Sequence, residues 1–204
     1  MIFATQCAGC DARGVPLCRT CRFALVSRTI PSAPPGVIAA IPFSGRARQV
    51  LLGFKYRNRR AIAGHLAGLL VNRMARSGNR VDLVTWAPTS GRRRRSRGFD
   101  QAELIARQVA RQLGVPCRRL LDRASAVGPQ TGRTRRERLA GSVFRARPDV
   151  RDRRILVVDD VVTTGATMTH AAQALTAAGA SDVMLYAVAS TPASFNRSGL
   201  AAVA

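Results

Sequence analysis

The stretch from Ile155 to Thr167, with the sequence ILVVDDVVTTGAT, decides the fold and the chemistry of this chain. Its four opening residues are apolar, and three of them are β-branched, which predicts a buried strand of a parallel sheet. Two neighbouring carboxylates, Asp159 and Asp160, are expected at the carboxyl end of that strand. A helix should follow, running to about Ala178 and ending at Gly179.

The turn between the strand and the helix predicts a phosphate site. Its residues offer backbone N–H groups, hydroxyls and the positive end of a helix dipole. Open α/β sheets bind ligands at the carboxyl ends of their strands, so the two acids should face the same ligand. Carboxylates repel a phosphate, and their natural partners are hydroxyls or a cation bound to that phosphate. The predicted ligand therefore has an anionic end and a diol end, as a ribose 5-phosphate has.

Two adjacent acids alone would favour a simpler interpretation, an acidic turn that only joins a strand to a helix. The whole string argues against it, because it resembles the phosphoribosyl pyrophosphate (PRPP) signature of type I phosphoribosyltransferases. The resemblance implies that Asp159 and Asp160 are catalytic and face the ribose 2- and 3-hydroxyls. It also implies a 5-phosphate cradle made of Thr163, Thr164, Gly165, Ala166 and Thr167.

Length and composition indicate a globular chain of one domain, or one domain with a small appendage. The chain has 204 residues, and 47% of them are hydrophobic, which is ample for a core. No apolar run approaches the roughly 18 residues that a membrane helix needs. The first ten residues, MIFATQCAGC, lack a basic segment before an apolar one, so no secretory signal is expected. We therefore predict a cytoplasmic protein without a membrane span.

The net charge of +22 comes from 33 Lys and Arg against 11 Asp and Glu, and Lys55 is the only lysine. Such a charge indicates a nucleic-acid partner or a polyanionic substrate. The alternative is a codon preference that spreads arginine over solvated faces. Aromatic residues make up only 5% of the chain, which gives few platforms for stacked bases. The charge by itself leaves both interpretations open.

Two CxxC pairs near the N-terminus predict a structural Zn²⁺ site with the ligands Cys7, Cys10, Cys18 and Cys21. Two disulfides are the alternative, and a reducing cytoplasm disfavours them. A thioredoxin-like site fits less well, because neither pair opens a helix of a βαβ unit. A segment as short as residues 1–30 cannot build its own core, so the metal should hold it together. The fifth cysteine, Cys117, is expected to be a buried small apolar residue.

The rest of the chain reads as alternating strands and helices. A linker is predicted at residues 27–36, a main domain at 37–190 and a tail at 191–204. Strands are expected near 37–43, 81–87, 118–121, 154–159 and 183–189. This order predicts an α/β fold, a mostly parallel sheet with helices on both faces.

A basic loop follows the strand near 81–87. This loop can reach the ligand crevice, and arginine forks suit a pyrophosphate. A merely solvated loop is the alternative for any run of charges. The predicted pyrophosphate-binding residues are Thr89, Ser90, Arg92, Arg94, Arg95 and Arg97.

Two further motifs follow the basic loop's strand: eight residues separate Pro88 from the sequence RGFDQA at 97–102, and PQTG stands at 129–132. With the cysteine pairs, these motifs resemble the ComF family, whose members often carry an N-terminal four-cysteine finger. Asp100 replaces a commoner Asn, and an Asn expected near Leu139 is missing. The resemblance implies the type I phosphoribosyltransferase fold preceded by a zinc knuckle.

The resemblance implies two functions. One is an enzyme that binds PRPP with Mg²⁺ and transfers the phosphoribosyl group to a nucleobase or an amine. The other is a protein without turnover that binds single-stranded DNA, works with competence proteins, and uses its pocket to sense PRPP. Walker A, HExxH and GxGxxG patterns are absent, so ATPase, zinc protease and dinucleotide-binding functions are not expected.

Overall fold

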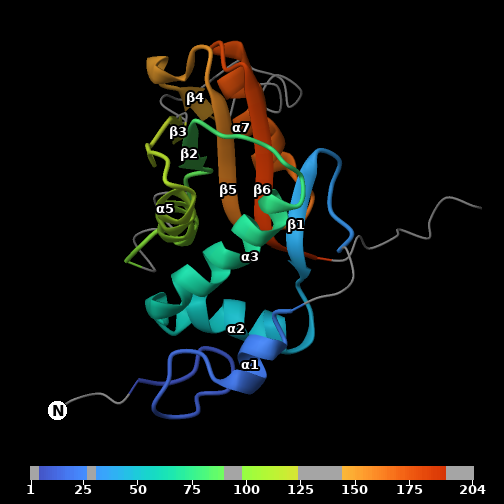
Figure 1. The fold of residues 1–204 in the computed structure, drawn as a ribbon, viewed down its shortest axis with the longest axis vertical. Helices are drawn as coiled ribbons and strands as arrows, with labels where there is room; N and C mark the ends of the chain where they lie inside the picture. Colours follow the sequence, from blue (N-terminus) through green and yellow to red (C-terminus); the bar gives the residue numbers. More distant parts are fainter. Residues whose placement is uncertain (1–4, 27–30, 90–97, 124–143, 192–204) are drawn as a thin grey trace, which may run out of the picture.

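The computed structural model describes residues 5–26, 31–89, 98–123 and 144–191 (Figure 1). Its main sheet has the order β1-β6-β5-β2, and every neighbouring pair of strands is parallel. The strands are β1 (Val37–Pro42), β2 (Leu83–Trp86), β5 (Arg154–Val162) and β6 (Asp182–Ser190). The predicted parallel sheet is therefore confirmed.

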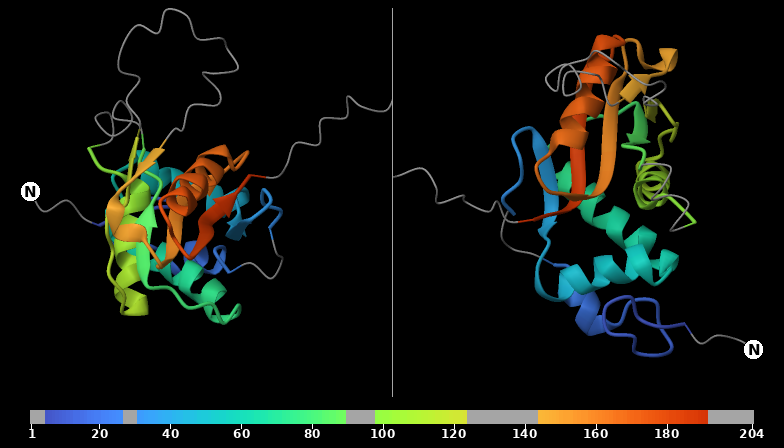
Figure 2. Two further views of the ribbon diagram at one scale, coloured as in Figure 1. Left: turned by 90° about the horizontal axis from the view of Figure 1, so that it is seen from above. Right: turned by 180° about the vertical axis from the view of Figure 1, so that it is seen from behind.

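Helices cover both faces of this sheet (Figure 2). The helices α3 (Ala63–Ala75) and α5 (Gln101–Leu113) cover one face, and α7 (Ala166–Ala177) covers the other. Side chains of β5 alternate between the two cores: Leu156 and Val158 join the first, and Ile155 and Val157 the second. Burial on both faces explains why this strand is a continuous apolar run.

The remaining helices lie at the carboxyl side of β1. The helix α2 (Gly45–Tyr56) follows β1, and the short helix η1 (Arg60–Ile62) leads into α3. The cysteine-rich segment, with its helix α1 (Arg19–Phe23), packs beside α2 (Figure 1). Its buried residues Cys7, Leu17 and Leu25 belong to the same hydrophobic cluster as α2 and α3. In the described part of the chain, no helix has the length and apolar character needed to cross a membrane.

The strand predicted at 118–121 is wrong as a strand of the main sheet. Residues 116–118 run beside β2 for one bridge, Val84 to Cys117, and the chain then leaves the sheet. At Leu120 a side chain replaces the backbone acceptor of a strand: buried Thr85 accepts the Leu120 N–H through its hydroxyl at 3.2 Å. The strand β3 (Leu121–Arg123) then pairs antiparallel with β4 (Phe144–Ala146), which the sequence did not predict, before the short helix η2 (Pro148–Val150).

The strand β5 extends beyond residue 159, where the sequence predicted its end. Its pairing with β6 continues to Val162 opposite Ser190, so both acids lie inside the strand. The extension follows from the partner, because β6 also has nine residues and offers its backbone groups over the same length.

We predict that Thr85→Val destabilises the fold by about 1–3 kcal/mol, because the buried Leu120 N–H loses its acceptor. Urea unfolding followed by circular dichroism measures the effect. The matched control is Thr176→Val at an exposed position of α7, which should change stability by less than about 0.5 kcal/mol. Equal stability of the two variants would contradict the assigned hydrogen bond.

Candidate functional site

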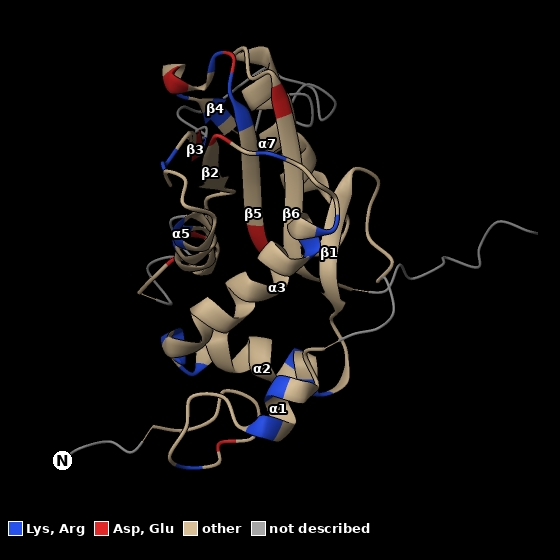
Figure 3. Cartoon of the chain, viewed as in Figure 1, with Lys and Arg blue, Asp and Glu red and all other residues tan. Residues whose placement is uncertain are grey.

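A cavity of about 560 Å³ opens at the carboxyl edge of the main sheet. Each strand contributes to its wall: Phe43 follows β1, Thr89 follows β2, Asp159 and Asp160 belong to β5, and Thr191 follows β6. This edge is where a parallel α/β sheet binds its ligands. In Figure 3 the acidic residues mark the lower end of β5, on the side of α2 and α3.

The two acids are distinct in their surroundings. Asp160 is buried, and its carboxylate lies 3.1 Å from the ammonium group of Lys55 on α2. Asp159 accepts the N–H of Asp160 at 2.7 Å, and Asp160 accepts the N–H of Val161 at 2.6 Å. Burial, and then the charge of Asp160, raise the pKa of Asp159 well above its usual value. The pair is therefore poised for hydroxyl donors or a cation.

The predicted phosphate loop lies at the start of α7. Thr163 and Thr167 line the same cavity as the acids, and Gly165 begins the helix with φ of 81°. Glycine has no side chain to cap the first turn, which leaves backbone N–H groups of that turn available to a ligand or water. A Cβ at this position would also lie 2.7 Å from Pro34, so only glycine fits here. Thr164 and Ala166 are exposed, and the Thr164 hydroxyl accepts the Ala166 N–H at 3.5 Å.

The wall opposite the phosphate loop is held by Asp100. Its carboxylate accepts the Thr89 N–H at 2.9 Å and caps α5 by accepting the Ala102 N–H at 3.1 Å. Both oxygens are used, which suits Asp better than the commoner Asn, whose amide nitrogen cannot accept. Burial raises the pKa of Asp100. The structure thus places Thr89 at the cavity. The other predicted pyrophosphate residues lie outside the described residues: Ser90, Arg92, Arg94, Arg95 and Arg97.

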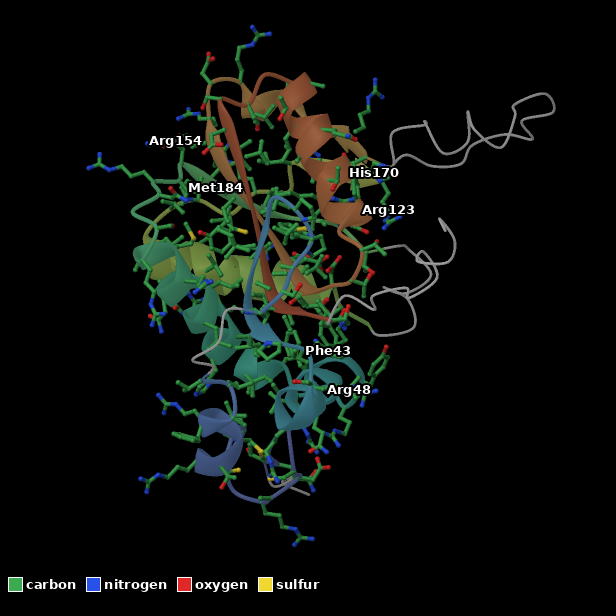
Figure 4. All side chains as sticks on the ribbon, turned by 90° about the vertical axis from the view of Figure 1, so that its right-hand side faces the viewer. Phe43, Arg48, Arg123, Arg154, His170 and Met184 are labelled. Atoms are coloured by element: carbon green, nitrogen blue, oxygen red, sulfur yellow. The ribbon has the colours of Figure 1, made fainter. Side chains whose placement is uncertain are left out.

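Sequence reasoning missed several residues of this cavity, above all Lys55. The sequence feature that could have indicated Lys55 is that it is the single lysine in a chain so rich in arginine. Phe43 and Tyr56 add an aromatic side, and the Arg48 guanidinium lies 5.8 Å from the centre of the Phe43 ring (Figure 4). Arg123, also labelled in Figure 4, lines the cavity and donates to the Pro88 carbonyl at 2.9 Å.

The four N-terminal cysteines converge away from this cavity. Their sulfur atoms all lie within 4.8 Å of one another, and those of Cys10 and Cys18 are 3.6 Å apart. Tetrahedral Zn²⁺ with bonds of about 2.3 Å separates its thiolates by about 3.8 Å, so the donor set fits. Backbone N–H groups of Gly9 and Cys18 donate to the Cys7 sulfur at 3.5 and 3.4 Å. The cluster is compatible with a structural zinc site.

Two thiols of the cluster have pKa values shifted in opposite directions. Burial raises the pKa of Cys7, but N–H donors led by those of Cys18 and Gly9 outweigh it and lower that pKa to about 6. Burial raises the pKa of Cys21 to about 12, even though Arg46 donates to its sulfur.

The fifth cysteine, Cys117, lies outside the cluster, and the prediction that it is buried is partly right. Its side chain is half-buried against the core, and burial raises its pKa to about 11.

Known proteins similar to this chain carry related domains. The phosphoribosyl transferase domain family matches residues 100–198. DNA utilization protein YhgH of Salmonella typhimurium is 28% identical over 202 residues, with 91% of this chain and 88% of the relative covered. YhgH of Salmonella typhi is 33% identical, and Competence protein F of Haemophilus influenzae is 29% identical. Each of these two matches covers 67% of this chain and 64% of the relative, just under two thirds.

The chain is thus homologous to proteins named DNA utilization protein YhgH and Competence protein F, and it carries a phosphoribosyl transferase domain. This domain has the type I phosphoribosyltransferase fold that the sequence predicts. Similar solved structures include the glutamine PRPP amidotransferase from B. subtilis, at 22% identity and a TM-score of 0.48 over 63% of this chain and 26% of that one. The purine phosphoribosyltransferase from Pyrococcus horikoshii is 14% identical, with a TM-score of 0.40 over 70% of this chain and 93% of that one.

The raised pKa of Asp159 has a consequence for the stability of this protein. The folded state keeps its proton to higher pH than the unfolded state does, so stability falls as pH rises from about 4 through the folded pKa. Asp159→Asn should therefore match the wild type below pH 4 and unfold at a higher temperature at neutral pH. Thermal unfolding at several pH values measures this.

The matched control is Asp182→Asn, at the exposed first residue of β6, which should not change the pH dependence in this way. A neutral-pH stability of Asp159→Asn below that of the wild type would contradict the assigned surroundings of Asp159.

Proposed function

We propose that the protein binds PRPP and handles its 5-phosphoribosyl group. The observation that carries the proposal is a single cavity whose wall combines the two acids of β5, two threonines of the phosphate loop and Thr89. A ligand there meets carboxylates that can accept hydroxyl protons, and it meets the side chains of Thr163, Thr167 and Thr89. PRPP matches this arrangement, with a ribose diol between a 5-phosphate and a pyrophosphate.

In this proposal the 5-phosphate binds residues 163–167, and the ribose hydroxyls donate to Asp159 and Asp160. The pyrophosphate lies toward Thr89, and Ser90 and the arginines at 92, 94, 95 and 97 complete its site. As pyrophosphate leaves C1 of the ribose, positive charge develops on the sugar, and the two carboxylates stabilise that charge. The aromatic side at Phe43 and Tyr56 suits a nucleobase as acceptor, and an amine is the alternative.

Mg²⁺ would enter this site with PRPP. Among the described residues, the cysteine cluster is the only group of three or more metal-binding side chains, so the diacid does not form a complete metal site. Mg²⁺ usually binds through one or two carboxylates together with substrate phosphates and water. Asp159 and Asp160 fit that role, and the phosphate oxygens of PRPP would supply the other ligands.

Thr164→Val tests the phosphate cradle. It removes one hydroxyl and should weaken the binding of PRPP and of ribose 5-phosphate equally, by about 10- to 150-fold, since a hydrogen bond to a charged group contributes about 1.5–3 kcal/mol. Binding of unphosphorylated ribose compounds should not change. Isothermal titration calorimetry measures all three, with Thr176→Val at the far end of α7 as control. Unchanged PRPP affinity in Thr164→Val would contradict the proposed cradle.

Turnover separates the enzyme from a PRPP sensor. Isotope-labelled PRPP should be screened against a panel of nucleobases and amines, with hydrolysis followed alongside. In an enzyme, Asp159→Asn with Asp160→Asn lowers turnover much more than PRPP affinity, because the acids act mainly on the transition state. A sensor has no turnover to lose, and PRPP would instead change its affinity for another ligand.

Single-stranded DNA is the second candidate ligand, and the net charge of +22 favours it. The relatives named DNA utilization protein and Competence protein F favour the same candidate. In this second proposal the protein works with competence proteins in the cytoplasm. A DNA-binding function requires an affinity that falls steeply with salt, because phosphate contacts release counterions. If PRPP strengthens or weakens this DNA binding, the protein acts as a PRPP sensor.

The cysteine cluster is proposed to hold one structural Zn²⁺ per chain. We further propose that residues 1–30 form the zinc knuckle, 37–190 the phosphoribosyltransferase-like domain and 191–204 a tail. Cys18→Ser should remove the metal and loosen the knuckle while the main sheet stays folded. Elemental analysis and amide hydrogen exchange measure the two effects. Cys117→Ser, outside the cluster, is the control; full zinc content in Cys18→Ser would contradict the ligand set.

A further inference from the structure

One short segment, the last turn of α2 and the loop after it, touches both the cavity and the cysteine-rich segment. The cysteine-rich segment, residues 5–26, is called the cysteine unit below. Gly53 lies so close to it that an added Cβ would be 2.0 Å from the Ala8 carbonyl oxygen. Arg57 donates to the same carbonyl at 2.6 Å and pairs with Asp11 at 2.9 Å.

Arg59 strengthens this attachment. It pairs with Asp11 at 3.2 Å and donates to the Gln6 side chain. Three positions of the segment, 53, 57 and 59, are thus fixed by the cysteine unit.

Lys55 stands in the same segment but turns the other way. Its ammonium group lies 3.1 Å from Asp160, with 15% of the Lys55 side chain and 10% of the Asp160 side chain exposed. Positions 53 and 57 share a helix face because they are four residues apart, whereas position 55 is about 200° around the helix from 53. The helix geometry itself sends Lys55 into the cavity while its neighbours face the cysteine unit.

A lysine is costly to hold in this place. Its flexible stem loses rotamer entropy when it is fixed, and its charge is largely desolvated. The compact ammonium group suits one carboxylate oxygen, whereas an arginine fork is wider and binds two. Fixing the backbone on both sides of Lys55 reduces the freedom of the stem. The contacts at 53, 57 and 59 provide that fixation.

We propose that Lys55 is a positioning residue of the candidate site, and that the docked cysteine unit holds it against Asp160. Through this contact Lys55 orients the Asp160 carboxylate and balances its charge before the ligand arrives. The state of the cysteine unit is thereby linked to the ligand site. The effect on PRPP rests on the proposed function, whereas the link between the cysteine unit and the Lys55–Asp160 pair does not.

The single lysine makes this link directly measurable. Protein labelled with ¹⁵N at the lysine Nζ gives one side-chain ammonium signal, which belongs to Lys55. In the wild type this signal should show the slow proton exchange of a buried ion pair. Asp160→Asn supplies the reference position of an unpaired Lys55.

Two variants undock the cysteine unit. Arg57→Met removes the bonds to Ala8 and Asp11, and Asp11→Asn weakens both arginine pairs at a side chain that is 45% exposed, so it should fold. Both should move the Lys55 signal toward the Asp160→Asn position and speed up its exchange. Arg76→Met, the same substitution at an exposed arginine after α3, should leave the signal unchanged. Amide signals of residues 7–21 report whether the unit has undocked.

A wild-type position of the Lys55 signal in a variant whose cysteine unit has undocked would overturn the link. A wild-type signal that coincides with the Asp160→Asn reference would overturn the ion pair itself. PRPP affinity is a separate readout. Lys55→Met should weaken PRPP binding by about tenfold or more, the scale for removing one partner of a largely buried pair. Lys55→Arg should recover part of the lost affinity. Failure of PRPP to bind any form would contradict the proposed function and leave the spectroscopic result standing.

Discussion

The pairing of β5 with β6 is the interaction on which the rest of the structure depends. The two strands run parallel over nine residues, from Arg154 opposite Asp182 to Val162 opposite Ser190. This length carries Asp159 and Asp160 inside a strand with a fixed backbone, while β2 pairs with the other edge of β5. A carboxylate pair in a flexible turn would be solvated and weakly oriented, whereas here burial holds it and raises the pKa of Asp159.

Charge around the cavity is balanced by groups from separate parts of the chain. Asp160 forms an ion pair with Lys55 of α2. The Asp100 carboxylate accepts hydrogen bonds from the N–H groups of Thr89 and of the first turn of α5. Asp159 accepts the Asp160 N–H instead, and it keeps the raised pKa. Such uneven stabilisation of neighbouring acids is common at functional sites, because a ligand or a metal completes the balance.

The cysteine unit is part of the same body as the site. Its side chains share a hydrophobic cluster with α2 and α3, and its backbone receives Arg57. A segment of this size cannot build a core of its own, so it needs a neighbouring surface to stay folded. Docking against α2 supplies that surface, and Gly53 makes the close approach possible.

The sequence by itself determined the elements with strong local signals: the buried strand before the acids, the Gly-Thr turn into a helix, the spacing of the four cysteines and the parallel α/β fold. These follow from hydrophobic periodicity, turn chemistry and ligand spacing, which act within about ten residues. Tertiary structure decided the length of β5, the departure of residues 119–123 from the main sheet, and the meeting of Lys55 with Asp160, 105 positions later. Each of these features depends on a partner distant in sequence. The partners are, in the same order, the long strand β6, the Thr85 hydroxyl and the docked helix α2. A local sequence pattern contains no information about such partners.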